Sequence, residues 1–412
     1  MLDLVESGPL PAHARVIAGP DVWMEGDAVA QFARVAALPG CVRAVAMPDL
    51  HPGRGIPVGA ALAFAGRVLP GLVGGDAGCG VRVVAVDGGR LSADALVRRV
   101  EEALAVDPLE GCDLGELLEA AWRRGARGLA EVTGVPDALA ALAAEEPEEA
   151  GPDPGGPPDR YDAALAGALG TIGGGNHFVE IAAVREVRDR DAAARAGIAP
   201  GGLVVVAHSG SRGLGGALAA RWAEAELEGD AIAPYLAELA GACRFARANR
   251  FVLAYRMLRA LGAARPGKIR GAFEVTHNDV VSEPVGGAPA WVHRKGAAPA
   301  RGRDLTIVLG SRGAPSWVME AADSEAGLRS VAHGAGRKMG RGEAREKLKA
   351  RYRRADLLRT RLGGRVLCDD PALLYEEHPD AYKPIEPVVA SLVAAGLATP
   401  VAALAPVVTV KR

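Results

Sequence analysis

A carboxylate and a thiol stand three residues apart in the glycine-rich stretch GGDAGCG, as Asp76 and Cys79. Apolar runs at Ile56–Phe64 and Val81–Val86 predict buried strands on either side, so a loop between strands would carry both side chains. A carboxylate with a thiolate suits a divalent metal of borderline softness. Taken alone, the stretch favours the alternative, a tight turn with a buried free cysteine.

Four of the eight histidines share a second pattern. Each lies at or just after the end of an apolar run that predicts a strand, with Gly, Asn or Ser beside it. They are His177, His208, His277 and His333. One such histidine is commonly structural, but four of them together with the Asp–Cys pair favour metal binding. Three histidines, one carboxylate and one thiolate could hold two ions of Mn²⁺ or Zn²⁺ if the thiolate bridges them.

His333 has different surroundings, HGAGRK, in which glycines and cations follow the imidazole. Backbone N–H groups and fixed positive charge suit a phosphate, and a neutral imidazole there could attack phosphorus. The alternative is a phosphate-binding or structural histidine. A second glycine cradle, GGGN, ends at Asn176.

Basic residues near these motifs could form a local phosphate patch, the alternative being ordinary solvated charge. They are Arg212, Arg294, Lys295, Arg337, Lys338 and Arg341. Solvated charge fits Arg345–Arg361 better, because Lys, Arg and Glu alternate there along a predicted helix.

Bulk composition limits the class of protein. Hydrophobic residues make up 49% of the 412 residues, so a globular core is expected. The net charge is −2, so any nucleic-acid contact must come from a local patch, and 4% aromatic residues argue against base-stacking platforms. Five scattered cysteines indicate a reducing compartment. With no signal peptide or long apolar run recognised, we expect a cytoplasmic protein.

The order of predicted elements is mixed, which favours an α+β fold with large mixed or antiparallel sheets. Further strands are expected at Val42–Met47, Phe178–Val184, Leu203–Ala207, Phe273–Thr276, Ala290–His293, Leu305–Leu309, Trp317–Met319 and Val401–Val410, and residues 13–90 are expected to hold only strands and glycine turns. Helices are expected at Ser92–Val106, Asp113–Gly125, Gly215–Leu261, Gly342–Leu362 and Ile385–Ala395. We expect one domain over residues 1–412, with an acidic, Pro/Gly-rich surface loop at 144–160.

The motifs, in this order, resemble those of the RtcB family of GTP-dependent RNA ligases. They are MPDLHPGRGIPVG, GGDAGCGV, GTIGGGNHFVEI, AHSGSRGLG, THNDV, VHRKGA and AHGAGRKM, and the likeness extends to the terminal VVTVKR. The first two motifs and their flanks are closer to a divergent bacterial branch than to the standard tRNA-splicing members. The loop LGSRGAPS also departs from the family's usual proline-glycine-serine-methionine-glycine sequence, which puts Arg312 near the nucleotide.

The resemblance implies an enzyme that uses GTP and two Mn²⁺ ions to join an RNA 3′-phosphate, or 2′,3′-cyclic phosphate, to a 5′-hydroxyl, in tRNA splicing or RNA repair. The implied ligands are Asp76, Cys79 and His177 for one ion and Cys79, His208 and His277 for the other, and the implied guanylylated nucleophile is His333. Positions that match the nucleotide site are Asn176, Glu180, Asn278, Ser311, Ser316, Gly334, Ala335, Gly336, Tyr382 and Lys411. Basic positions suited to RNA phosphates are Arg212, Lys295, Arg337 and Arg341.

An activator of the archease type is a further partner that the resemblance brings. Two other functions fit parts of the pattern. A dinuclear metal phosphoesterase would need the metals but no nucleotide, and a non-catalytic RNA end-binding protein would need neither reaction step.

Overall fold

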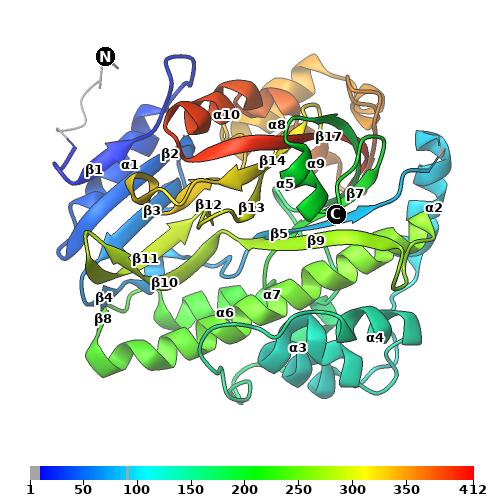
Figure 1. Ribbon diagram of the computed structural model, residues 1–412, viewed down its shortest axis with the longest axis horizontal. Coiled ribbons are helices and arrows are strands. Elements are labelled where there is room, and N and C mark those ends of the chain that lie inside the picture. Colours follow the sequence, from blue (N-terminus) through cyan, green and yellow to red (C-terminus); the bar gives the residue numbers. More distant parts are fainter. Residues whose placement is uncertain (1–9, 90–91) are drawn as a thin grey trace.

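Two large sheets organise the fold, and the apolar runs of the sequence supply their central strands. The computed structural model describes residues 10–89 and 92–412 (Figure 1). The first sheet has the strand order β1-β2-β3-β11-β10. Its strands are β1 (Ala14–Val16), β2 (Cys41–His51), β3 (Val58–Phe64), β11 (Ala288–Lys295) and β10 (Asn278–Val285). Within this first sheet, β1 and β2 pair in parallel and the other neighbouring strands pair antiparallel.

The second sheet is larger and runs β13-β14-β17-β6-β7-β5-β9, with β16 beside β17. Its strands are β13 (Leu305–Val308), β14 (Ser316–Ala321), β17 (Ala398–Lys411), β6 (Phe178–Val187), β7 (Leu203–Ser209), β5 (Gly80–Val86), β9 (Ile269–Thr276) and β16 (Arg365–Cys368). Two small pairs, β4 (Arg67–Val68) with β8 (Leu227–Glu228) and β12 (Ala297–Pro299) with β15 (Ser330–Ala332), complete the strands. The expected α+β class with largely antiparallel sheets is confirmed.

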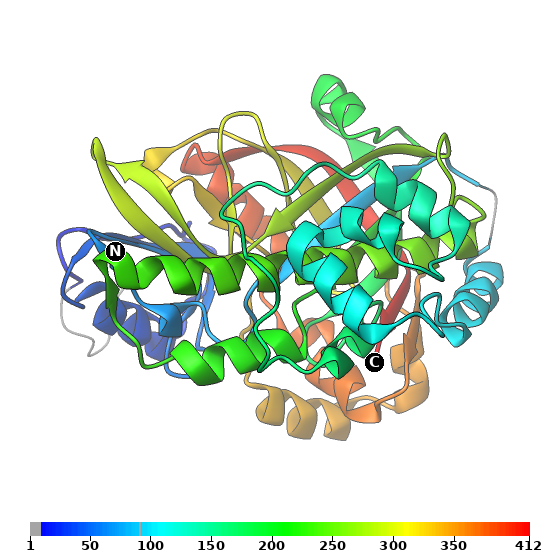
Figure 2. The ribbon, with the colours of Figure 1, turned by 90° about the horizontal axis from the view of Figure 1, so that it is seen from below.

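One long helix, α7 (Ile232–Leu261), packs against β5, β6 and β7 of the larger sheet. Its other side receives α2 (Ala93–Ala105) and α3 (Leu114–Gly128), so most of α7 is buried. Figure 1 shows α7 below β5 and β9. Figure 2, which views the molecule from below, shows α7 running across it. The remaining helices are α1 (Gly26–Ala36), α4 (Asp137–Ala144), α5 (Arg190–Arg195), α6 (Gly213–Trp222), α8 (Arg341–Arg351), α9 (Pro371–Glu376) and α10 (Ile385–Ala394).

The predicted strands are all present, and two predicted helices have a capping side chain at the first residue of the predicted range. The Ser92 hydroxyl accepts the N–H of Ala95, and the Asp113 carboxylate accepts that of Glu116. The prediction of only strands and turns in residues 13–90 is wrong, because α1 lies there. Its buried residues recur at helical spacing and pack against β2 and β3.

Two other helix predictions are wrong in extent. The block Gly215–Leu261 divides into α6 and α7, because Leu227–Glu228 pairs with β4 and Gly229 takes a φ of +54°. The charged helix Gly342–Leu362 ends at Arg351 as α8. Only Ala344 and Leu348 of α8 are buried. Two buried positions do not form an apolar stripe whose packing would stabilise the helix beyond Arg351.

Residues 145–160 contain no helix or strand, and Ala144, the first residue of the predicted loop, is the last residue of α4. The segment is nevertheless fastened to the body of the protein. The Glu146 carboxylate accepts a 2.8 Å bond from Arg82, and Glu149 pairs with Arg247 on α7. None of the helices in the described part of the chain is long and apolar enough to cross a membrane.

Candidate active site

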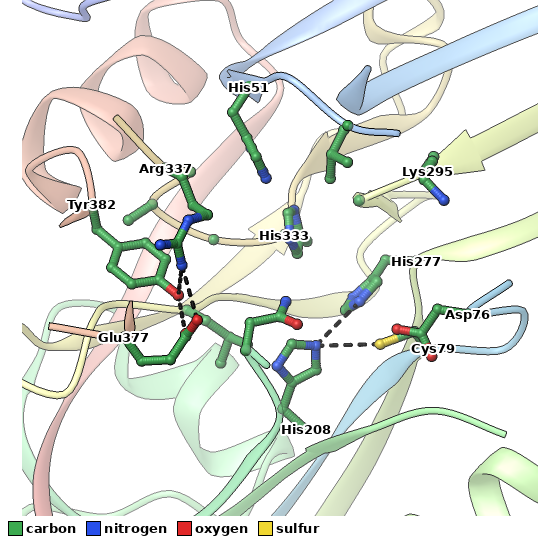
Figure 3. Close-up of a pocket in the computed structure, with 18 of the residues that line it drawn as sticks. His51, Asp76, Cys79, His208, His277, Lys295, His333, Arg337, Glu377 and Tyr382 are labelled. Atoms are coloured by element: carbon green, nitrogen blue, oxygen red, sulfur yellow. Dashed lines mark hydrogen bonds and ion pairs between the residues drawn. The ribbon is translucent and has the colours of Figure 1, made fainter. Parts of the chain in front are cut away.

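A pocket of about 750 Å³ gathers the ends of strands from both sheets (Figure 3). Cys79 directly precedes β5, His208 lies on β7 and His277 directly follows β9, all in the larger sheet. Lys295 ends β11 of the smaller sheet, and His333 directly follows β15. The sequence pattern that places these histidines at or just after strand ends therefore has a structural reason, because those strand ends meet at the pocket.

Five side chains form a cluster beside this pocket, four of them buried and the fifth, Asp76, partly exposed. The Cys79 Sγ lies 3.3 Å from Nε2 of His177 and 3.4 Å from Nε2 of His208. The His177 Nε2 lies 3.1 Å from Asp76 Oδ2, and the His208 Nε2 lies 3.4 Å from the His277 Nε2. Ligand atoms of Cys79, His177 and His208 all lie within 4.8 Å of one another. The five residues predicted as ligands are thus brought together.

The electrostatics of this cluster suit a cation. Burial lowers the pKa of both His208 and His277, which keeps these imidazoles neutral with a free lone pair. Burial also raises the pKa of the Cys79 thiol, and the nearby Asp76 carboxylate adds to that effect. Nitrogen, sulfur and oxygen donors that converge in this way, with both imidazoles neutral, fit a borderline metal ion.

Two buried polar residues of α7 hold the loops that carry the cluster. The Asn249 side chain accepts the N–H groups of Gly170 and Thr171 at 2.8 and 3.2 Å, and donates to Ser209 Oγ at 3.0 Å. The Arg250 guanidinium donates to the carbonyls of Gly78 and Ser209 at 2.8 and 2.7 Å. Sequence reasoning did not select either residue, because a polar residue inside a helical pattern gives no local signal.

Asn278 ties the same loop to the smaller sheet. Its side-chain amide donates to the Asp76 carbonyl at 2.9 Å, and its side-chain oxygen accepts the Gly296 N–H at 2.8 Å. Its backbone carbonyl accepts the N–H of Gly78, where an added Cβ would lie 2.8 Å from the Cys243 Cα on α7. Asn278 lines the pocket, but both ends of its amide are used within the protein.

His333 is held by a carboxylate that the sequence analysis did not single out. The Asp49 Oδ2 lies 2.7 Å from the His333 Nδ1 and accepts the N–H groups of His333 and Gly334 at 3.2 and 3.3 Å. Asp49 is fully buried. The His333 ring centroid lies 4.8 Å from that of His277, and Figure 3 shows His333 between His51 and the cluster of Cys79, His208 and His277. Nδ1 is buried against Asp49 and makes no hydrogen bond, so Nε2 is the ring nitrogen left for chemistry.

A second buried carboxylate, Glu377, collects three polar partners on the far side of the pocket (Figure 3). The Tyr382 hydroxyl donates to it, the Arg337 guanidinium lies 2.9 Å away and the Lys411 Nζ lies 3.5 Å away. Burial opposes ionisation, but Lys411 and Arg337 lower the pKa of Glu377 to about 2. Sequence reasoning missed Glu377, whose only local sign is the pair of glutamates at 376–377.

Glu180 is a buried carboxyl with a different environment. Thr409 donates to it at 2.5 Å, and burial raises its pKa to about 7. Lys411, on the same strand as Thr409, donates to the carbonyls of Gly175 and His177 at 3.2 Å each. The end of β17 thus contacts both the GGGN segment that ends at Asn176 and the backbone of His177 in the Cys–His cluster.

Most residues predicted for the nucleotide line this one pocket. They are Asn176, Glu180, Asn278, Ser311, Gly334, Ala335, Gly336, Tyr382 and Lys411. Ser316 does not line it; its hydroxyl is buried and accepts the Gly310 N–H at 3.1 Å. Arg312 lines the pocket and donates to the Leu374 carbonyl at 2.6 Å, while burial lowers its pKa to about 10.

Of the six predicted basic residues, Lys295, Arg337 and Arg341 line the pocket. Arg212, Arg294 and Lys338 do not line it, and Arg212 lies 3.5 Å from the His177 Nδ1. Arg337 also donates to the carbonyls of Met339 and Glu376, so its guanidinium is largely engaged.

The expectation that Arg294 belongs to a phosphate patch is wrong. Its side chain is fully buried and donates to Glu283 at 2.8 Å and to Ser330 at 2.9 Å. It is a structural cation of the smaller sheet.

The fold and the site define an α+β protein with a metal-type cluster beside a buried histidine–aspartate pair. The family model "tRNA-splicing ligase RtcB" matches residues 31–230 and 223–412, and the chain belongs to the RtcB family.

Three relatives illustrate the match. The RNA-splicing ligase RtcB2 of Escherichia coli is 38% identical over 98% of this chain and 97% of its own length. The RNA-splicing ligase RtcB of Mycobacterium tuberculosis is 32% identical over 92% of this chain and 100% of its own. The tRNA-splicing ligase RtcB of Archaeoglobus fulgidus is 31% identical over 93% and 90%.

Proposed function

We propose that this protein is an RNA ligase that joins an RNA 3′-phosphate, or 2′,3′-cyclic phosphate, to a 5′-hydroxyl with GTP and Mn²⁺. The observation that carries the proposal is the buried Asp49–His333 pair, 2.7 Å between Oδ2 and Nδ1, in the same pocket as the Cys79 cluster. Names of the relatives support the reaction class, and the nucleotide and the metal are our inference from the site.

His333 is the nucleophile in this proposal. In this proposal the Asp49 carboxylate, 2.7 Å from Nδ1, stabilises positive charge on the ring while the lone pair of Nε2 attacks the α-phosphorus of GTP, the bond to the bridging oxygen breaks and pyrophosphate leaves. The GMP group then passes from Nε2 to the RNA 3′-phosphate. Attack by the 5′-hydroxyl on that phosphorus, with loss of the hydroxyl proton to solvent, expels GMP and forms the phosphodiester. A 2′,3′-cyclic phosphate must first add water to give the 3′-phosphate that accepts GMP.

Asp76, Cys79, His177, His208 and His277 would hold the Mn²⁺ ions, with Cys79 shared. Bound metal supplies positive charge for the oxygens of the transferring phosphoryl group. The protein contributes neutral imidazoles at His208 and His277, which need no proton loss before they bind a cation.

The nucleotide would lie between the His333 loop and the end of β17. Glu180, when ionised, can accept N–H groups of guanine, and Glu377 holds Tyr382 and Lys411 at the same wall. In this proposal Glu377 is a positioning residue, because its oxygens are already occupied by protein groups.

GTP labelling tests the proposal directly. Protein incubated with α-labelled GTP and Mn²⁺ should acquire an acid-labile label that His333→Ala abolishes. His13→Ala is the matched control, since His13 bonds to the Ala36 carbonyl outside the pocket. The labelled protein should then seal a 3′-phosphate RNA to a 5′-hydroxyl RNA.

Two results would overturn the proposal. Phosphate release from RNA with no label would indicate a metal phosphoesterase, and RNA binding with neither label nor joined product would indicate an end-binding protein. Cleaved tRNA halves and other broken RNAs, offered in parallel with and without an archease-type activator, separate splicing from repair.

A further inference from the structure

A strongly basic surface begins at the rim of the pocket. Residues 338–361 contain ten Lys and Arg residues and three Asp and Glu residues, in a chain whose net charge is −2. The sequence pattern favoured ordinary solvated charge here, on the assumption of one helix with Glu interleaved among the cations. In the structure that assumption fails, because α8 ends at Arg351 and the acidic residues do not balance the surplus.

Six of these cations have no acidic partner. Within the described residues, no carboxylate oxygen lies within 4.0 Å of their charged nitrogens, and all six are exposed. They are Lys338, Lys349, Arg353, Arg354, Arg359 and Arg361. The others do have partners, such as Lys347, 2.7 Å from Glu343, and Arg351, 3.7 Å from Asp380. Lys349 lies on α8, Lys338 precedes this helix, and the other four follow it in the next ten residues. We call the six residues the α8 surface.

The position of the α8 surface connects it with the reaction. Arg341 is the first residue of α8 and lines the pocket. Its guanidinium packs against Gly175, since a Cβ added to that glycine would lie only 2.5 Å from a guanidinium nitrogen. From that point α8 extends for 11 residues, about 16 Å, along the lower edge of the molecule in Figure 2. This length is enough to follow several successive phosphates of one strand.

We propose that the α8 surface is a docking site for the phosphate backbone of the RNA strand whose end reacts in the pocket. This inference rests on the proposed function. The only aromatic residue of the segment, Tyr352, is stacked on His378 and donates to Asp380, so no free ring offers base stacking. Binding is therefore by charge, independent of base sequence and sensitive to salt. An acidic protein segment would match the charge equally, but it has no reason to continue into the pocket.

The test uses the triple variant Lys349→Ala, Arg353→Ala and Arg354→Ala in the full chain. Affinity for a 3′-phosphate RNA of about twenty nucleotides is measured by fluorescence anisotropy across a salt series. A matched control replaces Arg259, Arg265 and Lys268, three exposed cations that do not line the pocket, with Ala.

In the α8 variant, affinity should fall at least about tenfold at low salt, and the slope of log affinity against log salt should shrink by about 2, or roughly 0.7 for each lost phosphate contact. A three-nucleotide RNA should bind with unchanged affinity, because it does not reach the surface. The control variant should keep the slope of the wild type.

An unchanged affinity and slope for the long RNA would overturn the inference and leave the surface to an acidic protein or to solvent. GTP labelling of the same variant keeps the two proposals distinguishable. Normal labelling with unaltered RNA binding refutes the docking site alone, and absence of label in the wild type refutes the proposed function alone.

Discussion

Replacing Asp49 with Asn should slow guanylylation of His333 while leaving the fold intact. One oxygen of Asp49 lies 2.7 Å from the His333 Nδ1 and accepts two backbone N–H groups, and the carboxylate is fully buried. An Asn oxygen can still accept those bonds but carries no charge. As Nε2 attacks phosphorus, the imidazole becomes cationic, and the lost charge is then felt with little screening by solvent.

The Oδ2–Nδ1 contact is an ion-pair contact without a hydrogen bond, and its effect on the cationic ring is taken to be of the size of a hydrogen bond to a charged group. Hydrogen bonds to charged groups contribute about 1.5–3 kcal/mol, which corresponds to about 10- to 150-fold in rate. Single-turnover labelling with saturating GTP measures the step without RNA. Asp113→Asn is the matched control, because Asp113 accepts a backbone N–H at the start of α3 and Asn is an equally good cap.

Asp49→Ala separates positioning from folding. This change leaves the N–H groups of His333 and Gly334 unpaired, so the free energy of unfolding should fall by about 1–3 kcal/mol in addition to the loss of rate. Labelling of Asp49→Asn at the wild-type rate, with an unchanged melting temperature, would refute the role assigned to this carboxylate.

Three further predictions concern the metals, the base and the loop beside the nucleophile. Cys79→Ala should remove both metals together, and metal analysis that finds one ion retained would contradict the shared thiolate. The KM for GTP should fall as pH rises through about 7, because burial raises the pKa of Glu180 and only its ionised form accepts guanine N–H groups. Glu180→Gln should make KM independent of pH in this range. A wild-type KM that does not change with pH would contradict the contact between Glu180 and guanine. Since folding favours the protonated carboxyl, the free energy of unfolding of the unliganded protein should also fall across this window, up to about pH 7. Gly336→Ala should destabilise the protein by about 1–3 kcal/mol and slow labelling, because φ is +73° and the new Cβ would lie 2.2 Å from the Asp49 carbonyl. Chemical denaturation measures the loss of stability. The control is Gly342→Ala on α8, where the new Cβ meets no atom within 4 Å and should cost no stability.

The chemistry-bearing residues were predictable where the signal was local. Cys79 and His208 stand in glycine-rich motifs at strand ends, and such motifs can be recognised without knowing what they contact. Strands buried on both faces, such as β5 and β7, were equally clear as apolar runs.

The supporting residues could not be predicted, because their partners are remote in the chain. Asp49 meets His333 across 284 residues, and Arg250 meets Gly78 across 172. Nothing in the composition around Asp49 distinguishes it from a surface aspartate. Pattern also failed at α8, where charge alternation without buried positions predicted a helix longer than packing can support.

The bonds from Asn249 and Arg250 to the loops of the Cys–His cluster are made between protein groups alone, so under the proposed function they would hold these loops before an ion arrives. In this respect the site differs from zinc fingers, whose folding requires the ion. A chain of this kind can complete folding first and acquire its metal later, from whatever the cell supplies. Which ion occupies it would then depend on the relative abundance of free metals and their exchange rates, and one protein could change its metal during its lifetime without unfolding.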